Sequence, residues 1–293
     1  MSVNVVPGDK VAFLGVGNMG LHMAAALAKA GFRVIAWSRS ARTFSPTPGF
    51  EFSTDIDRAV DAAQAIVVCV TDHHAVEEIL FADGLADRLA AGCLVIDMGT
   101  SGAQAARRHH QLLAERRISY LDAPVSGGTV GAKEAALSIF VGGTDADFVR
   151  GKAVLHAMGT PHHLGPPGAG QTAKLANQII VGVTIAAVAE GLAFAETNGI
   201  DPRLLLLALD GGFAGSRILQ LHGPRMAERD YSAPGAVRLH LKDLDLAAGE
   251  VGWEILSHAQ QVKTGFEQLV RQGGSNRDHS SYAMLYQSER DQT

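Results

Sequence analysis

Hydrophobic positions fall into two patterns along this chain, and the change between them comes near residue 165. Before it, short apolar runs of strand length alternate with stretches in which apolar residues recur at helical spacing. The expected strands lie near residues 10–15, 32–37, 65–70, 94–97, 118–122, 136–141 and 161–164. Because strands and helices alternate, this part predicts an α/β fold with a doubly wound, mainly parallel sheet.

After Pro166 and Pro167 the pattern is helical to the end. The expected helices are a long one from about Gly170 to Asn198, and shorter ones at 202–209, 216–221, 235–249, 253–271 and 279–288. With 293 residues, 47% of them hydrophobic, the chain is long enough for two cores. We therefore expect two domains, 1–165 and an all-helical 166–293, with the active site where they meet.

A glycine-rich turn follows the first strand. Gly15, Gly17 and Gly20 have the spacing of the dinucleotide-binding fingerprint, between a strand and an Ala-rich helix pattern. The first glycine makes the tight turn, the second lets the pyrophosphate approach the backbone, and the third packs helix against strand. Asn18 and Met19 lie between them, at the helix N-terminus that faces the phosphates. The pattern therefore predicts that residues 1–165 form a Rossmann-like NAD(P)-binding domain.

The end of the second strand bears on which cofactor binds. NAD-selective sites carry an acid there, whereas this chain has Ser38, Arg39 and Ser40, with Arg42 close behind. Arg39 can pair with a 2′-phosphate and stack on the adenine, and the serines can donate hydrogen bonds. NADPH/NADP+ is the preferred cofactor on this pattern, with NAD(H) possible. The alternative is that Arg39 is a surface residue and both cofactors are accepted.

Two further strand ends belong to the predicted cofactor site. Thr71 and Asp72 end the strand at 65–70, and Thr100 follows the strand at 94–97. In a parallel sheet these ends lie at the carboxyl edge, where ligands bind. We therefore expect all three residues to contact the cofactor.

A turn of small residues, Asp122 to Gly128, predicts a binding site for a small carboxylate. Pro124 stiffens the turn, and Gly127 and Gly128 let a ligand approach the backbone and leave N–H groups to face it. Ser126 adds a hydroxyl. An ordinary turn between two strands is the alternative, since Gly and Pro mark any turn.

The long helix carries a lysine at an unusual place. Lys174 lies near its start, and Asn177 and Gln178 follow three and four residues later, on the same face. A partly buried lysine has a lowered pKa, which suits acid catalysis. The alternative is a solvated lysine, with the two amides as hydrogen-bonding contacts between helices.

These three motifs, in this order, resemble the β-hydroxyacid dehydrogenase family, and further matching runs lie at 240–244 and 278–280. The branch of tartronate semialdehyde (2-hydroxy-3-oxopropionate) reductases is the most similar. The resemblance implies an oxidoreductase that interconverts a short semialdehyde acid and its hydroxy acid. It makes Lys174 the proton donor, assigns Ser126, Gly127 and Gly128 to the substrate, and gives Asn177 and Gln178 supporting roles. It also places Lys242 near the nicotinamide and the substrate.

The chain departs from the family pattern at several positions. Gln178 stands where many members carry Asn, and Gly99 where some carry Ser. The stretch at 37–40 is unlike the acidic strand end of NADH-using members, and 43–52 is irregular for the family. These differences leave the reaction class intact and the exact substrate open.

Two alternatives to this function come from other classes. An imine reductase on the same fold generally lacks the lysine and the turn at 122–128, both present here. A dinucleotide-binding scaffold without catalysis would have lost Lys174. Fold alone does not separate these possibilities.

Composition and charge indicate which kinds of partner the protein binds and in which compartment it resides. The net charge is −5 and no Lys/Arg block occurs, so no nucleic-acid partner is indicated. Cys69 and Cys93 read as reduced core residues of a cytoplasmic protein, and the first residues lack a signal-peptide pattern. The histidine pairs at 73–74, 109–110 and 162–163 lack zinc-site spacing, so no metal is expected.

One apolar stretch, 179–195, is long enough to raise the question of a membrane. It contains Glu190, Thr184 and two glycines, so we expect a buried helix shared between domains or subunits. A shared helix predicts a homodimer or homotetramer, with a small-molecule carboxylate as the substrate.

Overall fold

The computed structural model describes residues 3–40 and 49–287, which form two compact units, Met1–Lys174 and Leu175–Thr293. The boundary between the units falls inside the long helix, after Lys174, rather than at residue 165 as the sequence predicts. Arg42, and most of the stretch 43–52, lie outside the described residues.

The N-terminal unit is built on one sheet, of nine strands in the described residues. The strands are β1 (Lys10–Leu14), β2 (Arg33–Trp37), β3 (Phe50–Ser53), β4 (Ala65–Val68), β5 (Leu94–Asp97), β6 (Ser119–Asp122), β7 (Val125–Ser126), β8 (Leu137–Gly142) and β9 (Gly159–Gly165). Their order is β3-β2-β1-β4-β5-β6-β8-β7, with β9 paired to β8. Pairs from β3 to β6 are parallel, and β8 runs antiparallel to β6 and β7.

The mainly parallel sheet predicted from the sequence is therefore confirmed, although β3 and β7 were not expected. β7 has only two residues, too few for a periodic pattern to reveal. β3 has only four residues, so its alternation is too short to stand out after the Pro- and Gly-containing stretch that precedes it.

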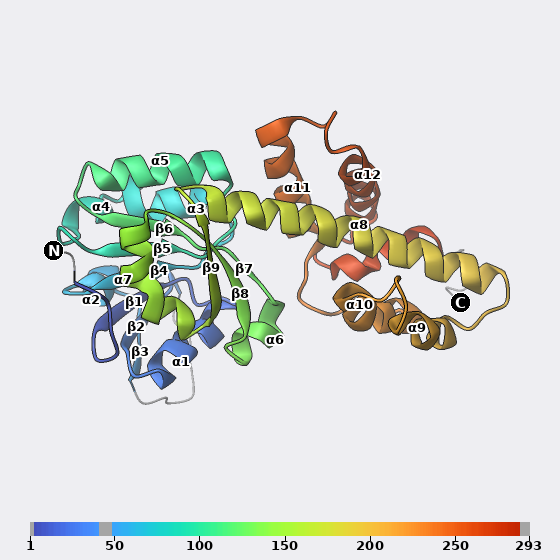
Figure 1. Ribbon diagram of the computed structural model, residues 1–293, viewed down its shortest axis with the longest axis horizontal. Helices are drawn as coiled ribbons and strands as arrows, with labels where there is room; N and C mark the ends of the chain where they lie inside the picture. Colours follow the sequence, from blue (N-terminus) through green and yellow to red (C-terminus); the bar gives the residue numbers. More distant parts are fainter. Residues whose placement is uncertain (1–2, 41–48, 288–293) are drawn as a thin grey trace. The chain divides into compact units, whose positions relative to one another are not determined.

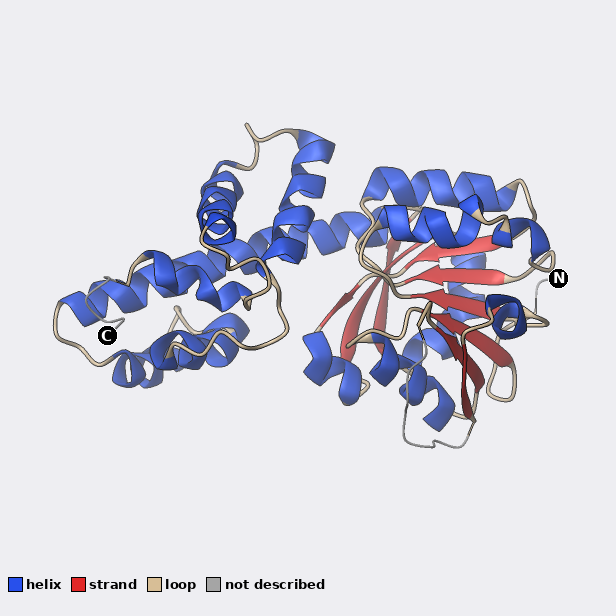
Figure 2. Ribbon diagram, turned by 180° about the vertical axis from the view of Figure 1, so that it is seen from behind, coloured by secondary structure: helices blue, strands red, loops and turns tan. Residues whose placement is uncertain are grey.

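Helices cover both faces of this sheet (Figures 1 and 2). Within β1, Val11 and Phe13 point to one core and Ala12 and Leu14 to the other, and all four are fully buried. The first core is completed by helices α1 (Gly20–Lys29), α6 (Gly128–Lys133) and α7 (Asp145–His156). The second is completed by α2 (Ile56–Val60), α3 (His73–Glu77), the π-helical Glu78–Ala82, α4 (Leu85–Arg88) and α5 (Ala103–Ala114).

The regular elements of the C-terminal unit, in its described residues, are all helices, as expected. Its elements are the long α8 (Ala169–Thr197), which begins in the first unit, then α9 (Pro202–Asp210), α10 (Arg217–Glu228), α11 (Val237–Val251), α12 (Ser257–Arg271) and the 3-10 helix η2 (His279–Leu285). The predicted end of α10 at 221 is wrong, because the helix continues through Gly223 and Pro224. Gly223 faces Leu206 of α9, where a Cβ would collide. The predicted helix at 253–271 begins later, at Ser257.

Helix α8 is long and apolar enough to cross a membrane by length and composition alone, which is weak evidence for a single helix. The helix has two kinds of face. Ile185, Ala189 and Leu192 are buried in the core of the C-terminal unit, whereas the side chains of Ile180 and Phe194 are 66% and 73% exposed. The sequence predicts a buried helix shared between domains or subunits, and within this chain one face of the helix is buried.

Candidate functional site

The glycine-rich turn has the geometry that its spacing predicts. Gly15 has a φ of +106°, and a Cβ there would collide with the main-chain oxygen of Cys69. A Cβ at Gly20, where α1 begins, would collide with the oxygen of Gly15. Around Gly17, by contrast, a Cβ would meet nothing within 4 Å. The turn therefore packs tightly on two sides and leaves an open side at Gly17, which fits the approach of a dinucleotide pyrophosphate.

At the end of β2, the predicted phosphate-binding residues contact one another and Glu78. Ser38 Oγ donates to the main-chain oxygen of Ser40 at 2.7 Å, and Arg39 Nη1 lies 3.2 Å from Glu78 Oε1. The side chains of this ion pair are 74% and 57% exposed. An exposed pair is weak, so a cofactor phosphate can compete for the guanidinium. Glu78 begins the π-helical segment and was not identified from the sequence.

Thr71 and Asp72 shape the turn after β4. Asp72 caps the N-terminus of α3, since its Oδ1 accepts from Ala75 N at 3.0 Å. Thr71 Oγ1 donates to Asp72 Oδ2 at 3.2 Å. Both lie at the carboxyl edge of the sheet, as expected, and Thr100 lies in the corresponding turn after β5.

Two buried acids, Asp97 and Asp122, lie side by side at this edge, as Cα partners on β5 and β6. Asp97 accepts from Gly99 N at 3.0 Å, from Ser101 Oγ at 3.0 Å and from Tyr120 Oη at 3.2 Å. Burial raises the pKa of Asp97 despite these donors. Gly99 itself leaves no room for a side chain, because a Cβ would lie 2.6 Å from the oxygen of Val70.

Asp122 binds the start of the lysine-bearing helix α8. Its Oδ1 accepts from Gly168 N and its Oδ2 from Gln171 N, both at 2.8 Å. A Cβ at Gly142 would lie 2.5 Å from Asp122 Oδ1, and one at Gly170 would lie 2.5 Å from its main-chain oxygen. Glycine is therefore required where the strand and the helix meet. Burial raises the pKa of Asp122 to about 6.

Gln171 connects the same helix to the turn after β5. Its Oε1 accepts from Ser101 N at 3.0 Å and Gly102 N at 3.3 Å, and its Nε2 donates to Gly99 O at 2.9 Å. The residue is fully buried. Gln171 and Asp122 together tie the turn after β5 and the end of β6 to the helix, three residues before Lys174. Sequence reasoning missed these roles; the available signal was a polar residue in an otherwise small and apolar helix start.

The turn at 125–128 has backbone angles that require glycine. Gly127 has a φ of +133° and Gly128 of +62°, and α6 begins at Gly128. A Cβ at Gly128 would meet nothing within 4 Å, so this side of the turn is open to a ligand. Ser126 lies next to it in β7 and is half-buried.

Further along α8, the predicted amides are joined to α11. Lys174 is half-buried. Asn177 Nδ2 donates to Gln178 Oε1 at 3.0 Å, and Gln178 Nε2 donates to Asp243 Oδ2 at 2.6 Å. Lys242 Nζ lies 3.1 Å from Asp243 Oδ1. Asp243, which sequence reasoning missed, therefore joins Lys242 to Gln178.

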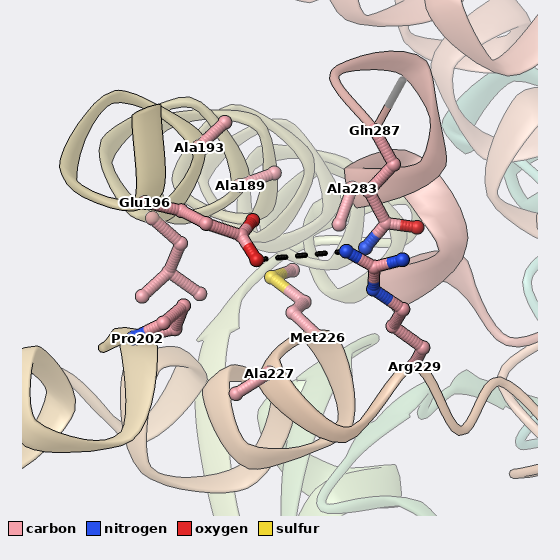
Figure 3. A pocket seen from close by; sticks show the side chains of 10 residues that line it. Ala189, Ala193, Glu196, Pro202, Met226, Ala227, Arg229, Ala283 and Gln287 are labelled. Carbon is pink, nitrogen blue, oxygen red and sulfur yellow. Dashed lines mark hydrogen bonds and ion pairs between the residues drawn. The ribbon is translucent and has the colours of Figure 1, made fainter. Parts of the chain in front are cut away.

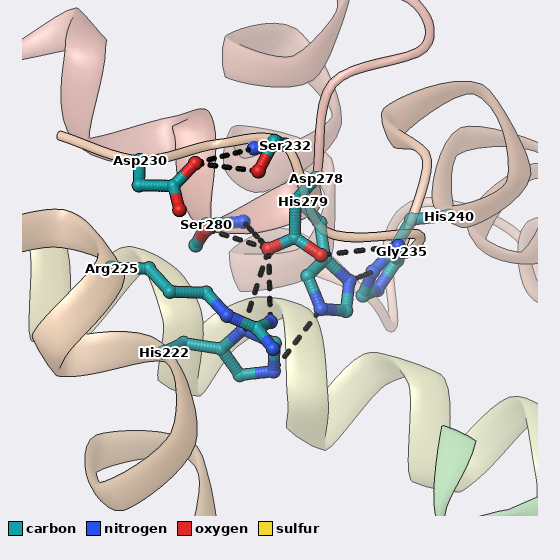
Figure 4. Close-up of polar contacts among 9 residues, drawn as sticks. All are labelled: His222, Arg225, Asp230, Ser232, Gly235, His240, Asp278, His279 and Ser280. Atoms are coloured by element: carbon teal, nitrogen blue, oxygen red, sulfur yellow. Dashed lines mark hydrogen bonds and ion pairs between the residues drawn. The ribbon is translucent and has the colours of Figure 1, made fainter. Parts of the chain in front are cut away.

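One cluster of possible metal ligands occurs among the described residues, and it is not one of the histidine pairs considered from the sequence. Atoms of His222, Asp278 and His279 lie within 4.8 Å of one another (Figure 4). Arg225 Nη1 lies 3.2 Å from His222 Nδ1 and 3.6 Å from Asp278 Oδ1, and so already supplies a cation there. Asp278 also accepts from Ser280 N and Oγ. We assign no metal to this cluster.

A small pocket in the C-terminal unit lies apart from the predicted residues (Figure 3). Four of its ten lining residues are alanines, and Glu196 and Arg229 lie 3.5 Å apart in its lining. None of the predicted catalytic or binding residues lines it, and we assign it no role in the reaction.

Comparison with known proteins identifies the family of the chain. Residues 10–180 match the model of the NAD binding domain of 6-phosphogluconate dehydrogenase, and residues 168–286 match that of the NAD-binding region of NADP-dependent 3-hydroxyisobutyrate dehydrogenase. The 2-hydroxy-3-oxopropionate reductase of Escherichia coli is 38% identical over 277 residues, which are 93% of this chain and 95% of the relative.

Among solved structures, a member of the 3-hydroxyisobutyrate dehydrogenases has a higher TM-score with this chain than an imine reductase has. The 3-hydroxyisobutyrate dehydrogenase of Salmonella typhimurium superposes with a TM-score of 0.84 at 26% identity, over 94% of this chain and 99% of that one. An imine reductase of Myxococcus stipitatus shares the fold, with a TM-score of 0.64 at 18% identity over 95% of this chain and 99% of that one. The chain therefore belongs to the β-hydroxyacid dehydrogenase family of NAD(P)-dependent oxidoreductases.

Proposed function

We propose that this protein reduces a short semialdehyde acid with NADPH, and in reverse oxidises the corresponding hydroxy acid. The observation that carries the proposal is the placement of Lys174. The base of the helix that bears it is bound by Asp122 to the end of β6 and by Gln171 to the turn that follows β5. The reductase name of the Escherichia coli relative supports the same substrate class.

The residues of this chain divide the chemistry between them. When bound, the reduced nicotinamide supplies the hydride that reaches the aldehyde carbon. Lys174, as the ammonium, protonates the alkoxide that forms, and in the reverse direction it is the base. Ser126 and the amides of Gly127 and Gly128 hold the substrate carboxylate.

Residues beyond the lysine have supporting roles in the proposal. Asn177 and Gln178, one turn later on the same helix, orient the lysine or a substrate oxygen. Lys242 lies near the nicotinamide and the substrate, and Asp243 fixes its ammonium by the 3.1 Å contact.

The cofactor site follows the carboxyl edge of the sheet. Its pyrophosphate part is the turn formed by Gly15, Gly17, Asn18, Met19 and Gly20. Ser38, Arg39 and Ser40 select the 2′-phosphate, so NADPH is preferred and NAD(H) is used less well. Thr71, Asp72 and Thr100 complete the site.

A panel of aldehydes tests the proposal. NADPH oxidation is measured with tartronate semialdehyde, methylmalonate semialdehyde, succinic semialdehyde, glyoxylate and a cyclic imine, and repeated with NADH. We expect the highest kcat/KM with one of the first two acids and NADPH. Activity on the imine alone would support the alternative of an imine reductase. No activity with either cofactor would support a non-catalytic dinucleotide-binding scaffold.

We also propose that the protein is a cytoplasmic homodimer or homotetramer. Exposed apolar side chains gather on helices α8 and α9, including Ile180, Phe194, Leu204 and Leu207, with exposures of 64% to 77%. Faces of this kind are usually covered by another subunit. Gel filtration at micromolar concentration should show an oligomer, and a monomer would contradict the proposal.

A further inference from the structure

Three histidines of the C-terminal unit form a continuous chain of short contacts, which we call the histidine chain (Figure 4). His222 Nε2 lies 3.3 Å from His279 Nε2, and His279 Nδ1 lies 3.1 Å from His240 Nδ1. His240 Nε2 lies 2.9 Å from the main-chain oxygen of Gln178. The histidine chain therefore begins on α10, passes through the start of η2 and α11, and ends on α8.

The carbonyl of Gln178 determines where the hydrogens lie. A carbonyl only accepts, so His240 Nε2 carries a hydrogen and Nδ1 of the neutral ring is an acceptor. His279 must then donate through Nδ1 and accept through Nε2, and His222 must donate through Nε2. His222 Nδ1 is left as an acceptor, 3.2 Å from the Arg225 guanidinium. The contacts between the rings, and those with Gln178 and Arg225, are satisfied with three neutral imidazoles.

The charged groups around the histidine chain limit how many protons it can hold. His222 Nδ1 lies 3.4 Å from Asp278 Oδ1, and Arg225 faces both. A proton on His279 would place N–H against N–H at one of its two contacts. Burial, and secondly the neighbouring His240, lower the pKa of His279 to about 3, which agrees with this geometry.

Small residues make room for the contact between α11 and α8. A Cβ at Gly182, one turn after Gln178, would lie 2.9 Å from His240 Nε2. On the other side, the ring of Phe266 in α12 packs against His240, with centroids 5.2 Å apart. His240 thus binds the main chain of Gln178, while Asp243 binds its side chain at 2.6 Å.

We propose that the histidine chain is a positioning device, which fixes the register of α11 on α8 and so places Lys242 and Asp243 beside Gln178. His240, His279 and His222 are positioning residues that act through Gln178 and Asp243. The catalytic consequence rests on the proposed function, whereas the tautomers of the histidine chain do not.

Nitrogen-15 NMR of the full-length protein at pH 8 reads the tautomers directly. We expect the Nε2–H form for His240 and His222 and the Nδ1–H form for His279, with assignments from single His→Gln variants. An Nδ1–H form for His240, or a charged His279, would overturn the proposal. This measurement needs no substrate and no cofactor, so it stands even if the panel of aldehydes shows no activity.

Two glycine substitutions on α8 form a matched pair for the kinetic test. Gly182→Ala and Gly191→Ala add the same methyl group to the same helix, but only the first meets His240, and around Gly191 a Cβ meets nothing within 4 Å. Misplacement near an active site can cost up to about a hundredfold. We expect Gly182→Ala to lower kcat/KM by about tenfold to a hundredfold and to lose the Nε2–H signal of His240, while Gly191→Ala retains both. Equal kcat/KM for the two variants would overturn the positioning role.

Two substitutions of His240 separate its hydrogen bond from its bulk. In His240→Gln the side-chain amide can still donate to Gln178, whereas in His240→Phe the ring cannot donate. The positioning role predicts that the glutamine variant keeps most of the activity and the phenylalanine variant loses it. The opposite order would contradict the role.

Discussion

The lysine-bearing helix α8 is held at two places by polar groups of opposite character. At its first turn, the buried carboxylate of Asp122 and the side chain of Gln171 bind main-chain groups of the helix and of the turn after β5. Further along, in the other unit, the main-chain oxygen of Gln178 accepts from His240, the last of three imidazoles that the hydrogen bonds keep neutral. The first place buries a charge among N–H donors, and the second contains no charge among its linked rings.

The difference shows what each place can tolerate. The carboxylate of Asp122 accepts from main-chain N–H groups and needs no particular tautomer. The histidine chain needs one tautomer at every ring. A change of tautomer at any ring therefore weakens the hydrogen bond from His240 to the main-chain oxygen of Gln178. Substitutions and pH should therefore affect the two places differently.

The largest effect is expected when the lysine that both places support is removed. Lys174→Ala should lower kcat by about 10²–10⁴, because one acid/base group contributes that much, while the Kd for NADPH stays unchanged. Stopped-flow rates and NADPH fluorescence measure the two quantities. Lys152→Ala, an exposed lysine on α7, is the control. A near-wild-type kcat for Lys174→Ala would contradict the role of Lys174 as the proton donor.

Substitution of Gln171 tests only the contacts at the first turn of α8. Gln171→Ala leaves Ser101 N and Gly102 N without their acceptor, at about 1–3 kcal/mol for each buried group. The turn that carries Thr100 should then shift, and kcat/KM should fall by about tenfold to a hundredfold. Gln111→Ala, on the exposed side of α5, should change neither Tm nor rate. If both variants behave alike, Gln171 does not position the helix.

Substitutions at the cofactor site of the N-terminal unit should change kcat/KM less, and mainly with NADPH. Arg39→Ala removes the guanidinium expected to bind the 2′-phosphate, so kcat/KM with NADPH should fall about tenfold, with little change for NADH. Glu78→Gln removes the competing carboxylate 3.2 Å away and should raise kcat/KM with NADPH. Equal losses with both cofactors in Arg39→Ala would count against phosphate recognition.

Acid should change the stability of the two units in opposite directions, by a few degrees in Tm. The pKa of Asp122 is raised from its ordinary 3.8 to about 6 in the folded chain, so its proton uptake stabilises the N-terminal unit as pH falls from about 6 to 4. The pKa of His279 is lowered from 6.5 to about 3, so the stability of the C-terminal unit is present above pH 6.5 and is lost as pH falls towards 3.

Hydrogen exchange followed by mass spectrometry can resolve this difference, because peptides report on each unit separately. Peptides of α12 should lose protection between pH 6.5 and 4, after correction for the intrinsic exchange rate, and peptides of β5 and β6 should not. His279→Gln should abolish the acid-dependent loss in α12. Parallel loss in both units would contradict the assignment of the two pKa shifts.

Much of the N-terminal unit could be predicted from the sequence, because its signals are local. The turn at Gly15–Gly20 and the apolar runs of β1, β4 and β5 each fix their own structure. The roles of Asp122 and Gln171 could not be predicted, since their partners lie 46 to 72 residues away in the chain.

In the C-terminal unit the helices were evident, but the contacts among them were not. His222 and His279 are 57 residues apart, and the histidines that drew attention in the sequence were adjacent pairs. Adjacency gives no information on contacts between different elements. The rings of His73 and His74 lie 4.0 Å apart on one helix, whereas the histidine chain joins side chains from three elements. The continuation of α10 through Pro224 was also missed, since its packing against Leu206 of α9 outweighs the local helix-breaking signal.

The most direct test of the central claim compares two substrates that differ in one group. Tartronate semialdehyde carries a carboxylate where glyceraldehyde carries a hydroxymethyl group, and both present the same aldehyde to NADPH. If Ser126 and the amides of Gly127 and Gly128 hold that carboxylate, kcat/KM should be about 10²-fold higher or more for the acid, since charge-assisted hydrogen bonds contribute about 1.5–3 kcal/mol each. Equal values of kcat/KM for the two aldehydes would contradict the proposed substrate class.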